Sequence, residues 1–261
     1  MNKIHLVIPD SHAKPNVSNN RFDLLGRLIV DLKPDVIINI GDMADMESLC
    51  MYDVGKKSFE GRRYKKDIEA VIDAQEKMFY YLNEYNDKQR RLKQKQYKPE
   101  LHFCLGNHEE RINRVVELQP QLEETISIKD LRYEEFGWTL HPFKSPVAID
   151  GILYSHYFTS GIMGKAISSV HTAYTLLQKK HQSCTQGHSH LLDYCTLTTG
   201  EGKKLQGLSC GSFLEKDQFE SYAGVESNQM WWRGLIVKHI TTNGYDLETI
   251  SIERLEEIYG N

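Results

Sequence analysis

The chain has 261 residues, enough for one large α/β domain or two small ones. Its composition, 40% hydrophobic and 26% charged with a net charge of −4 at pH 7, is ordinary for a soluble globular protein. No apolar run approaches the roughly 18 residues that a membrane span needs, and the run at residues 4–9 is too short for a signal peptide. We therefore expect a cytoplasmic protein with no membrane partner. Five cysteines without CxxC spacing argue against a disulfide framework or a zinc knuckle.

The N-terminal half alternates apolar runs with amphipathic stretches. Residues 3–9 and 35–40 read as buried strands, and the apolar residues of 20–32 between them keep helical spacing. This strand–helix–strand order predicts a parallel pair joined by a crossover helix. Further along the chain we expect a long helix at 65–95, a third strand at 100–105, and helical segments at 109–118 and 121–131.

The second half is richer in strand signals. Two hairpin turns, Asp150-Gly151 and Asn243-Gly244, lie within it. The pattern predicts a hairpin at 147–155, a helix at 165–180, and strands at 183–186, 193–198, 206–212, 234–241 and 245–252. We find no internal repeat or clear linker, so a single domain over 1–261 is the simplest account. The apolar residues of 249–259 suit packing on the domain or on a neighbour, which leaves the oligomeric state open.

Residue types that bind metals follow the predicted strands. Asp10-Ser11-His12 and His188-Ser189-His190 each place two ligands at i and i+2, on one side of an extended segment. Asp42 adds a carboxylate that can bridge two cations, Asn107 an amide oxygen and His156 an imidazole. This donor set suits divalent manganese, iron, zinc or nickel, and the lack of thiolates argues against a purely structural zinc site.

Each motif taken alone has an ordinary structural explanation. An Asp-x-His segment is most often a capped loop, Gly-Asp after a strand is usually a turn, and a single histidine is more often hydrogen-bonded than a ligand. Five such motifs in this order, each at the end of a predicted strand, are hard to explain as coincidence. In parallel sheets, ligands gather beyond these strand ends.

Together the motifs resemble the ordered signature of the calcineurin-like metallophosphoesterase superfamily, which here spans residues 10–190. The motifs are Asp10-Ser11-His12, Gly41-Asp42, Gly106-Asn107-His108-Glu109, His156 and Gly187-His188-Ser189-His190. The resemblance implies an α/β fold of two packed mixed β-sheets flanked by helices in a four-layer sandwich, with a basic helical insertion at about 46–98. It also implies two divalent metal ions, manganese first, with iron, zinc or nickel as alternatives.

The resemblance further implies a role for each matching residue. One metal would be held by Asp10, His12 and His190, and the second by Asn107, His156 and His188, with Asp42 bridging the two ions. His108 would not be a ligand, because the matching histidine of the family contacts the phosphate and helps to protonate the leaving oxygen. The expected reaction is the hydrolysis of a phosphate ester, with His108 as general acid.

The substrate is less well defined. Protein phosphatases of the superfamily carry a motif similar to Gly-Asp-x-x-Asp-Arg-Gly. This chain has Met46 and Glu47 in place of the last two residues, so a phosphoprotein substrate is less favoured. Arg111 and Arg114 offer a substitute grip on phosphate, or simply a solvated helix face. A phosphodiesterase or nuclease is the leading hypothesis, and a phosphomonoesterase is the alternative. A non-catalytic scaffold is less favoured, because every ligand position is filled.

A basic segment stands out on an otherwise acidic chain. Residues 55–98 contain 13 lysine and arginine residues and 7 acidic ones, with tyrosines interleaved. One interpretation is a contact with nucleic acid, whose backbone attracts cations and whose bases stack on aromatic rings. The more ordinary one is an amphipathic helix with a solvated basic face. The Trp231-Trp232 pair likewise suits either base stacking or packing.

Overall fold

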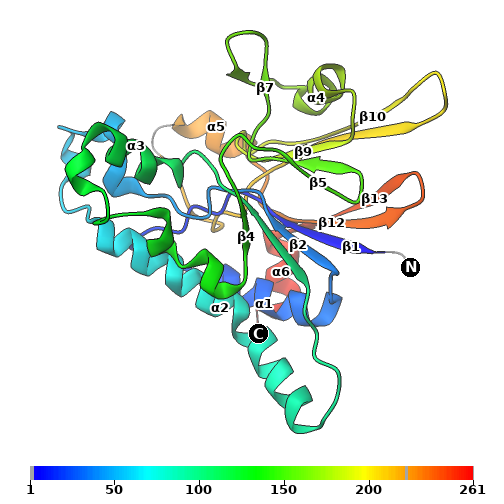
Figure 1. Ribbon diagram of the computed structural model, residues 1–261, viewed down its shortest axis with the longest axis horizontal. Helices are drawn as coiled ribbons and strands as arrows, with labels where there is room; N and C mark the ends of the chain where they lie inside the picture. Colours follow the sequence, from blue (N-terminus) through cyan, green and yellow to red (C-terminus); the bar gives the residue numbers. More distant parts are fainter. Residues whose placement is uncertain (1–2, 221–222, 261) are drawn as a thin grey trace.

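Two β-sheets packed face to face, with helices on both outer sides, make up the computed structural model, which describes residues 3–220 and 223–260 (Figure 1). The expected α/β class and the two mixed sheets are thereby confirmed. No helix in these two ranges is long and apolar enough to cross a membrane.

The first sheet carries the strands that lead to the predicted site. Its order is β13-β12-β1-β2-β3-β4, with β1 to β4 parallel and β12 antiparallel to both β1 and β13. Its strands are β1 (Ile4–Ile8), β2 (Val36–Asn39), β3 (Glu100–Cys104), β4 (Thr139–His141), β12 (Gly234–Thr241) and β13 (Gly244–Ser251).

The second sheet comes mainly from the later part of the chain. Its order is β10-β11-β9-β6-β5, with β6, β9 and β11 parallel. Its strands are β5 (Val147–Ile149), β6 (Ile152–Tyr154), β9 (Cys184–Gln186), β10 (Leu192–Thr198) and β11 (Lys204–Cys210). A separate short hairpin pairs β7 (Thr159–Ser160) with β8 (Lys165–Ala166).

Alternation along the first-sheet strands divides the apolar core into two layers. Leu6 and Ile8 of β1 face the helices on the outer side of the sheet, whereas Val7 faces the second sheet, as expected from the period of two in a strand. The outer helices are α1 (Asn20–Leu32), α2 (Tyr64–Arg91) and α6 (Ile252–Tyr259). On the far side of the second sheet, α4 (Thr172–Lys180) packs through Leu176. The result is a four-layer arrangement.

Several boundaries differ from the sequence prediction. The helix expected at 165–180 begins only at Thr172, because Ile167 pairs with the backbone of Phe158 and the Thr172 hydroxyl bonds to Ser169. The helix expected at 121–131 is replaced by short 3-10 turns at Pro120–Leu122 and Ile128–Leu131. Strand β4 and helices α5 (Gly224–Met230) and α6 had not been assigned, whereas α3 (Glu110–Leu118) matches its prediction.

Candidate metal centre

The loops after β1 and β2 are tied together directly beyond the carboxyl ends of these strands. The backbone amides of Ser11 and His12 both donate to the carbonyl of Asp42, at 3.1 and 2.9 Å. His12, Asp42, His188 and His190 all have positive φ angles, at 43°, 51°, 69° and 58°. Left-handed backbone is uncommon for such residues and collects at functional sites. These turns bring side chains from distant parts of the chain together.

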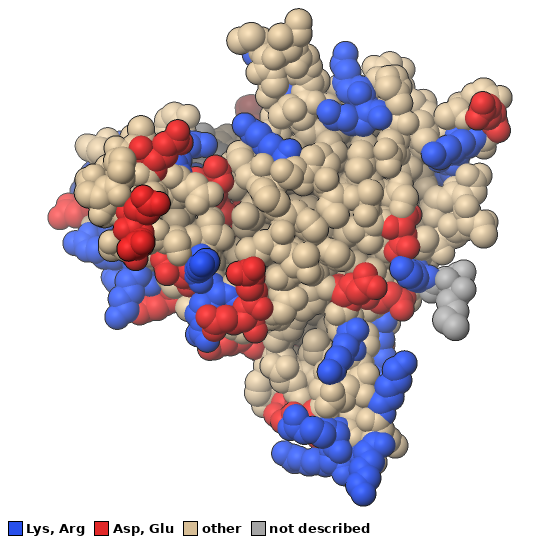
Figure 2. Space-filling view, viewed as in Figure 1, with Lys and Arg blue, Asp and Glu red and all other residues tan. Residues whose placement is uncertain are grey.

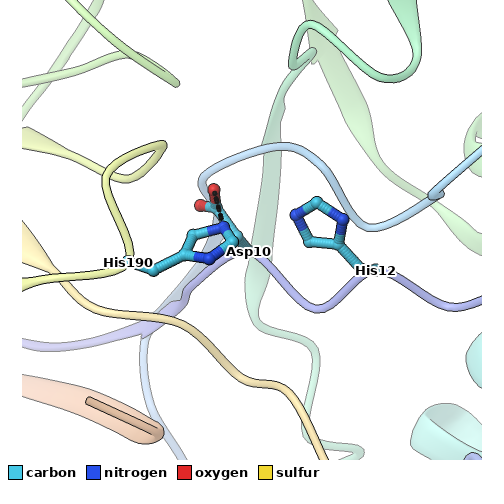
Figure 3. Close-up of side chains that lie close together, drawn as sticks. All are labelled: Asp10, His12 and His190. Carbon is cyan, nitrogen blue, oxygen red and sulfur yellow. Dashed lines mark ion pairs between the residues drawn. The ribbon is translucent and has the colours of Figure 1, made fainter. Parts of the chain in front are cut away.

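The first group of candidate ligands joins the loop after β1 to the loop after β9 (Figure 3). It consists of Asp10, His12 and His190, whose nearest ligand atoms all lie within 4.8 Å of one another. All three side chains are buried, and His190 Nε2 lies 3.2 Å from Asp10 Oδ2.

The second group consists of Asp42, His156 and His188, which meet the same 4.8 Å criterion. His156 Nδ1 lies 3.1 Å from the carbonyl of Ile40, so it is the protonated nitrogen. Its Nε2 therefore faces inward, 3.2 Å from Asp42 Oδ2 and 2.9 Å from the amide oxygen of Asn107. A hydrogen bond to the outer nitrogen in this way fixes the tautomer that a metal ligand needs. The same 4.8 Å criterion also brings together His12, Asp42 and His108, so that Asp42 belongs to two groups.

Asp42 lies between the two groups. Its Oδ2 is 3.2 Å from His156 Nε2 in the second group and 4.0 Å from His12 Nε2 in the first. Its other oxygen accepts the backbone amide of His108 at 2.8 Å, which fixes the orientation of the carboxylate.

Two glycines leave room for the two carboxylates. A Cβ atom on Gly106 would lie 2.1 Å from Asp42 Oδ1, and one on Gly187 would lie 2.1 Å from Asp10 Oδ1. Both distances are far inside van der Waals contact. The glycines of the Gly-Asn-His-Glu and Gly-His-Ser-His motifs are therefore required by the close approach of backbone and carboxylate.

The electrostatics of the site favour added positive charge. Burial opposes ionisation of Asp42 and Asp10, but the nearby His156 holds the pKa of each carboxyl below its usual range. Burial lowers the pKa of His156 itself, and the two carboxylates more than offset this and raise it to about 9. Burial and the positive charge on His156 lower the pKa of His188 to about 4. In the metal-free chain Nε2 of His156 therefore also carries a proton, which a metal ion at this nitrogen would displace.

Buried atoms without hydrogen-bond partners test whether metal ions fit here. Among the described residues, Asp10 Oδ1, both ring nitrogens of His12 and His190 Nδ1 are buried and lack a partner. Buried polar atoms are rarely left unpaired. Carboxylate, imidazole and amide donors converging in this way have the composition of a site for divalent transition metals. The residues present therefore fit the metals that the resemblance implies.

His108 lies beside Asp42 and is oriented by Asp45, a residue that the sequence analysis did not assign to the site. His108 Nδ1 lies 2.8 Å from the carbonyl of Asp45 and 3.1 Å from its carboxylate. Burial opposes ionisation of Asp45, but His108 and His12 hold the pKa of its carboxyl well below its usual range. The Asp42-x-x-Asp45 spacing was the available signal. This contact leaves Nε2 of His108 on the side of Asp42, 3.8 Å from its Oδ2.

Glu109 is the second residue whose function the sequence analysis missed. Its fully buried carboxylate accepts the backbone amides of Asp42, Ala44 and Gly106 at 2.9–3.0 Å, and the hydroxyl of Tyr133 at 3.1 Å. Burial and the charge of Asp42 raise the pKa of this carboxyl. Glu109 therefore joins the loops that carry the candidate ligands Asp42 and Asn107.

A pocket of about 360 Å³ opens beside His108. Four cationic and four carboxylate side chains line its wall, so that it is polar and balanced in charge. Arg111 lies on this wall, donates to the carbonyl of Asp45 at 2.8 Å and lies 3.2 Å from His108 Nε2. Arg114 is exposed and lies off the pocket wall.

The two tryptophans lie at the rim of the centre. The ring of Trp231 is 4.4 Å from that of His190, and Trp232 packs against the apolar layer between the sheets. The backbone amide of Trp232 donates to the carbonyl of His190 at 3.1 Å. This contact helps to hold the loop that carries His190, so packing accounts for Trp232.

Comparison with solved structures gives distant likenesses. No family model and no curated protein sequence matches the chain. The solved structure of YfcE, a phosphoesterase from E. coli, aligns with 95% of this chain and 99% of its own, at 11% identity and a TM-score of 0.37. Another crystal structure aligns with 96% of this chain and 100% of its own, at 10% identity and a TM-score of 0.40. At these TM-scores neither likeness bears on the chemistry of the chain.

Proposed function

We propose that this chain is a two-metal phosphoesterase of calcineurin-like type, acting as a phosphodiesterase or nuclease on nucleotide or nucleic-acid substrates. The observation that carries the proposal is the position of Asp42 between two groups of mostly buried candidate ligands, 3.2 Å from His156 and 4.0 Å from His12. A carboxylate shared by two such groups is what a paired metal site requires.

The proposal assigns the ligands to two ions. Asp10, His12 and His190 would hold one, and Asn107, His156 and His188 the other, with Asp42 shared. When bound, two divalent ions supply Lewis-acid activation of water and neutralise charge on the phosphoryl oxygens. The buried side chains hold these donors rigid, and the glycines at 106 and 187 let the backbone approach the carboxylates closely.

His108 is proposed as the general acid for the leaving oxygen. Its Nδ1 lies 2.8 Å from the carbonyl of Asp45, which leaves Nε2, 3.8 Å from Asp42 Oδ2, as the nitrogen that would carry the proton for the leaving group once a bound phosphate engages the Arg111 guanidinium. Arg111 approaches the same nitrogen at 3.2 Å, so a phosphate beside His108 would also meet a guanidinium. The polar, charge-balanced pocket next to His108 suits a leaving group rich in hydroxyl or amide groups, such as a nucleoside.

A phosphomonoesterase is the second candidate, and one contact favours it. Met46, which stands where the related protein phosphatases have arginine, is fully buried. Arg111 donates to the carbonyls of Asp45 and Met46 at 2.8 and 3.3 Å. Its guanidinium is therefore near the place of the missing arginine, where it would suit a phosphomonoester dianion.

Hydrolysis of two chromogenic esters distinguishes these candidates. We expect the manganese-loaded protein to hydrolyse bis-p-nitrophenyl phosphate faster than p-nitrophenyl phosphate, and to lose both activities after chelation. A preference for the monoester would favour a phosphatase. No metal-dependent hydrolysis of either ester, or of an oligonucleotide, would reject the proposed function.

A further inference from the structure

The C-terminal end of α2 projects from the body of the protein without burying any side chain. The buried residues of this 28-residue helix end at Leu82, and none of residues 83–92 is buried. Figure 1 shows this end of the helix extending past the first sheet. Helices draw most of their stability from a packed face. This end of the helix contacts the rest of the chain at its edge, through Tyr85 with Lys33 and Asn86 with Tyr97, and its other faces are open to a partner.

Six exposed cations cover this projection, which we call the basic tip (Figure 2). They are Lys88, Arg90, Arg91, Lys93, Lys95 and Lys98. Residues 85–98 contain only one acidic residue, Asp87, and so carry a net charge of +5. Because the whole chain carries −4, the remainder carries −9. A polyanion would therefore be repelled by the body and attracted to the tip.

The segment that follows the helix is held in place by specific hydrogen bonds. The Asn86 side chain donates to the carbonyl of Tyr97 at 2.8 Å and accepts its backbone amide at 2.9 Å. The hydroxyl of Tyr97 donates to the carbonyl of Pro34 at 2.5 Å. The cations between Asn86 and Tyr97 are thus presented on a closed, anchored turn.

Cations at the two ends of the basic segment differ in their partners. Near the pocket, Lys56 and Arg62 both bind Asp53 at 2.8 Å. At the tip, Arg90 pairs with Asp87 at 2.8 Å. The other five tip cations have no ion-pair partner among residues 3–220 and 223–260.

Lys57, Arg63 and Lys66 near the pocket likewise have no ion pair in these ranges, but Arg63 and Lys66 share their surface with the carboxylates of Glu47 and Glu60. Because Asp87 is the one acidic residue within residues 85–98, we restrict the nucleic-acid interpretation to the tip.

We propose that the basic tip binds the phosphate backbone of a polynucleotide. Free lysine and arginine side chains are the groups that neutralise backbone phosphates, and the exposed amides of Asn83 and Gln94 add hydrogen-bond donors suited to phosphate and base edges. Leu92 is the one exposed large apolar side chain within residues 83–98. A membrane-binding or protein-binding surface would need a larger apolar patch.

The position of the tip defines the shortest substrate that can contact both the tip and the catalytic centre. This inference about length rests on the proposed function. Helix α2 begins next to Arg62 of the pocket wall, and 28 residues at about 1.5 Å each place its other end roughly 40 Å away. A nucleic-acid strand rises about 3.4 Å per nucleotide. A polynucleotide of about 12 nucleotides or more is therefore needed to occupy the tip and the catalytic centre together.

Fluorescence anisotropy with the metal-free full chain tests binding without catalysis. The probes are a labelled single strand and a labelled duplex of about 20 nucleotides, at salt from about 50 to 200 mM. The tip variant is Lys88→Gln, Arg91→Gln, Lys93→Gln and Lys95→Gln. The control variant removes the same charge from exposed lysines elsewhere, through Lys129→Gln, Lys165→Gln, Lys179→Gln and Lys203→Gln.

We expect the tip variant to bind the oligonucleotides at least about tenfold more weakly, and the slope of log affinity against log salt concentration to fall by about 3 to 4. The control variant should bind them within about twofold of wild type. Equal weakening in both variants, unchanged binding in the tip variant, or tip-dependent binding to phosphatidylserine vesicles in place of oligonucleotides would overturn the inference. Hydrolysis of bis-p-nitrophenyl phosphate should be equal in all three proteins. Its absence from metal-loaded wild type, with tip-dependent binding intact, would reject the proposed function but not the binding site.

Discussion

The carboxylate of Glu109 accepts the backbone amide of Asp42 at 3.0 Å. The same carboxylate accepts the amides of Ala44 and Gly106 and the hydroxyl of Tyr133. Four donors thus converge on one buried group, which no neutral side chain of similar shape can satisfy. The loop that presents Asp42 and the loop that presents Asn107 and His108 are therefore held in one arrangement before any ligand binds.

Replacing Glu109 should loosen both loops. In Glu109→Gln one carboxylate oxygen becomes an amide nitrogen that faces backbone donors, so we expect a loss of about 2–4 kcal/mol in the free energy of unfolding of the metal-free protein. Tyr133→Phe removes only one of the four hydrogen bonds and should cost about 1 kcal/mol. Urea unfolding in the presence of a chelator measures both. Equal stability of Glu109→Gln and wild type would contradict this role.

The two glycines against the carboxylates should be essential for metal binding. A methyl group on Gly106 or Gly187 would lie 2.1 Å from Asp42 or Asp10, so the carboxylate must move away from its partners. We expect Gly106→Ala and Gly187→Ala each to weaken metal affinity by about tenfold or more, as judged by the effect of misplaced ligands. Gly200→Ala is the matched control, because nothing lies within 4 Å of its added Cβ atom. Equal manganese affinity in all three variants would refute the account.

Loss of His108 should matter most for poor leaving groups. Nitrophenolate leaves without protonation, whereas an alkyl or nucleoside oxygen needs a proton from the general acid. We expect His108→Ala to lose about 10²–10⁴-fold in kcat on an alkyl or nucleoside ester and much less on a p-nitrophenyl ester. Asp45→Asn should show the same bias with a smaller loss, since Asp45 orients His108. An equal loss on both esters would exclude the general-acid role.

A buried lysine between the sheets should make stability depend on pH. Lys238 donates to the hydroxyls of Thr185 and Tyr154, and burial lowers its pKa to about 7, against about 10.4 in an unfolded chain. Between these values the unfolded chain holds a proton that the folded chain has lost. Raising the pH from about 7 to 10 should therefore stabilise the fold, by at most about 5 kcal/mol.

Lys238→Met removes this titration. The variant should exceed wild type in the free energy of unfolding by most near pH 7, where the buried charge is most costly. This difference should shrink toward pH 10. Urea midpoints at several pH values measure the difference directly. The exposed Lys203→Met is the control and should show no such trend. A difference for Lys238→Met that stays constant with pH would contradict the lowered pKa.

Much of the candidate centre follows from local sequence, because each ligand comes directly after a strand or within a short motif. Asp10, Asp42, Asn107 and His156 lie just beyond the ends of β1, β2, β3 and β6. An apolar run followed by a polar ligand is visible in one sequence. The meeting of Asp10, Asp42 and Asn107 in space follows from the parallel order of β1, β2 and β3, whereas His156 joins them through the packing of the second sheet on the first.

Contacts between distant loops could not be predicted in the same way. Asp45 and Glu109 contact the site across sequence separations above sixty residues, and neither belongs to a periodic pattern. The predicted start of the helix at 165–180 was wrong for a similar reason. Ile167 falls within an apparent helical pattern, but it pairs with Phe158 and packs beneath the second sheet. Tertiary contacts of this kind override local propensity.

The different surroundings of the two ends of the basic segment could not be predicted from the sequence either. Its cations fall into two runs, at 56–66 and 88–98, with only Lys77 between them, and the 28-residue helix α2 holds Arg62 at the pocket far from Arg91 at the tip. Only the three-dimensional arrangement shows that Lys56 and Arg62 share the carboxylate of Asp53 near the pocket, whereas Arg90 is the one tip cation with an ion pair among the described residues.

Metal stoichiometry tests the central claim most directly. Manganese is titrated calorimetrically into chelator-stripped wild type, His190→Ala and His156→Ala, and hydrolysis of bis-p-nitrophenyl phosphate is followed on the same samples. The account predicts two ions per wild-type chain, one per chain in each variant, and activity only when both ions are bound. A wild-type chain that binds one ion or none, or that hydrolyses the diester equally well after chelation, would contradict a two-metal phosphoesterase.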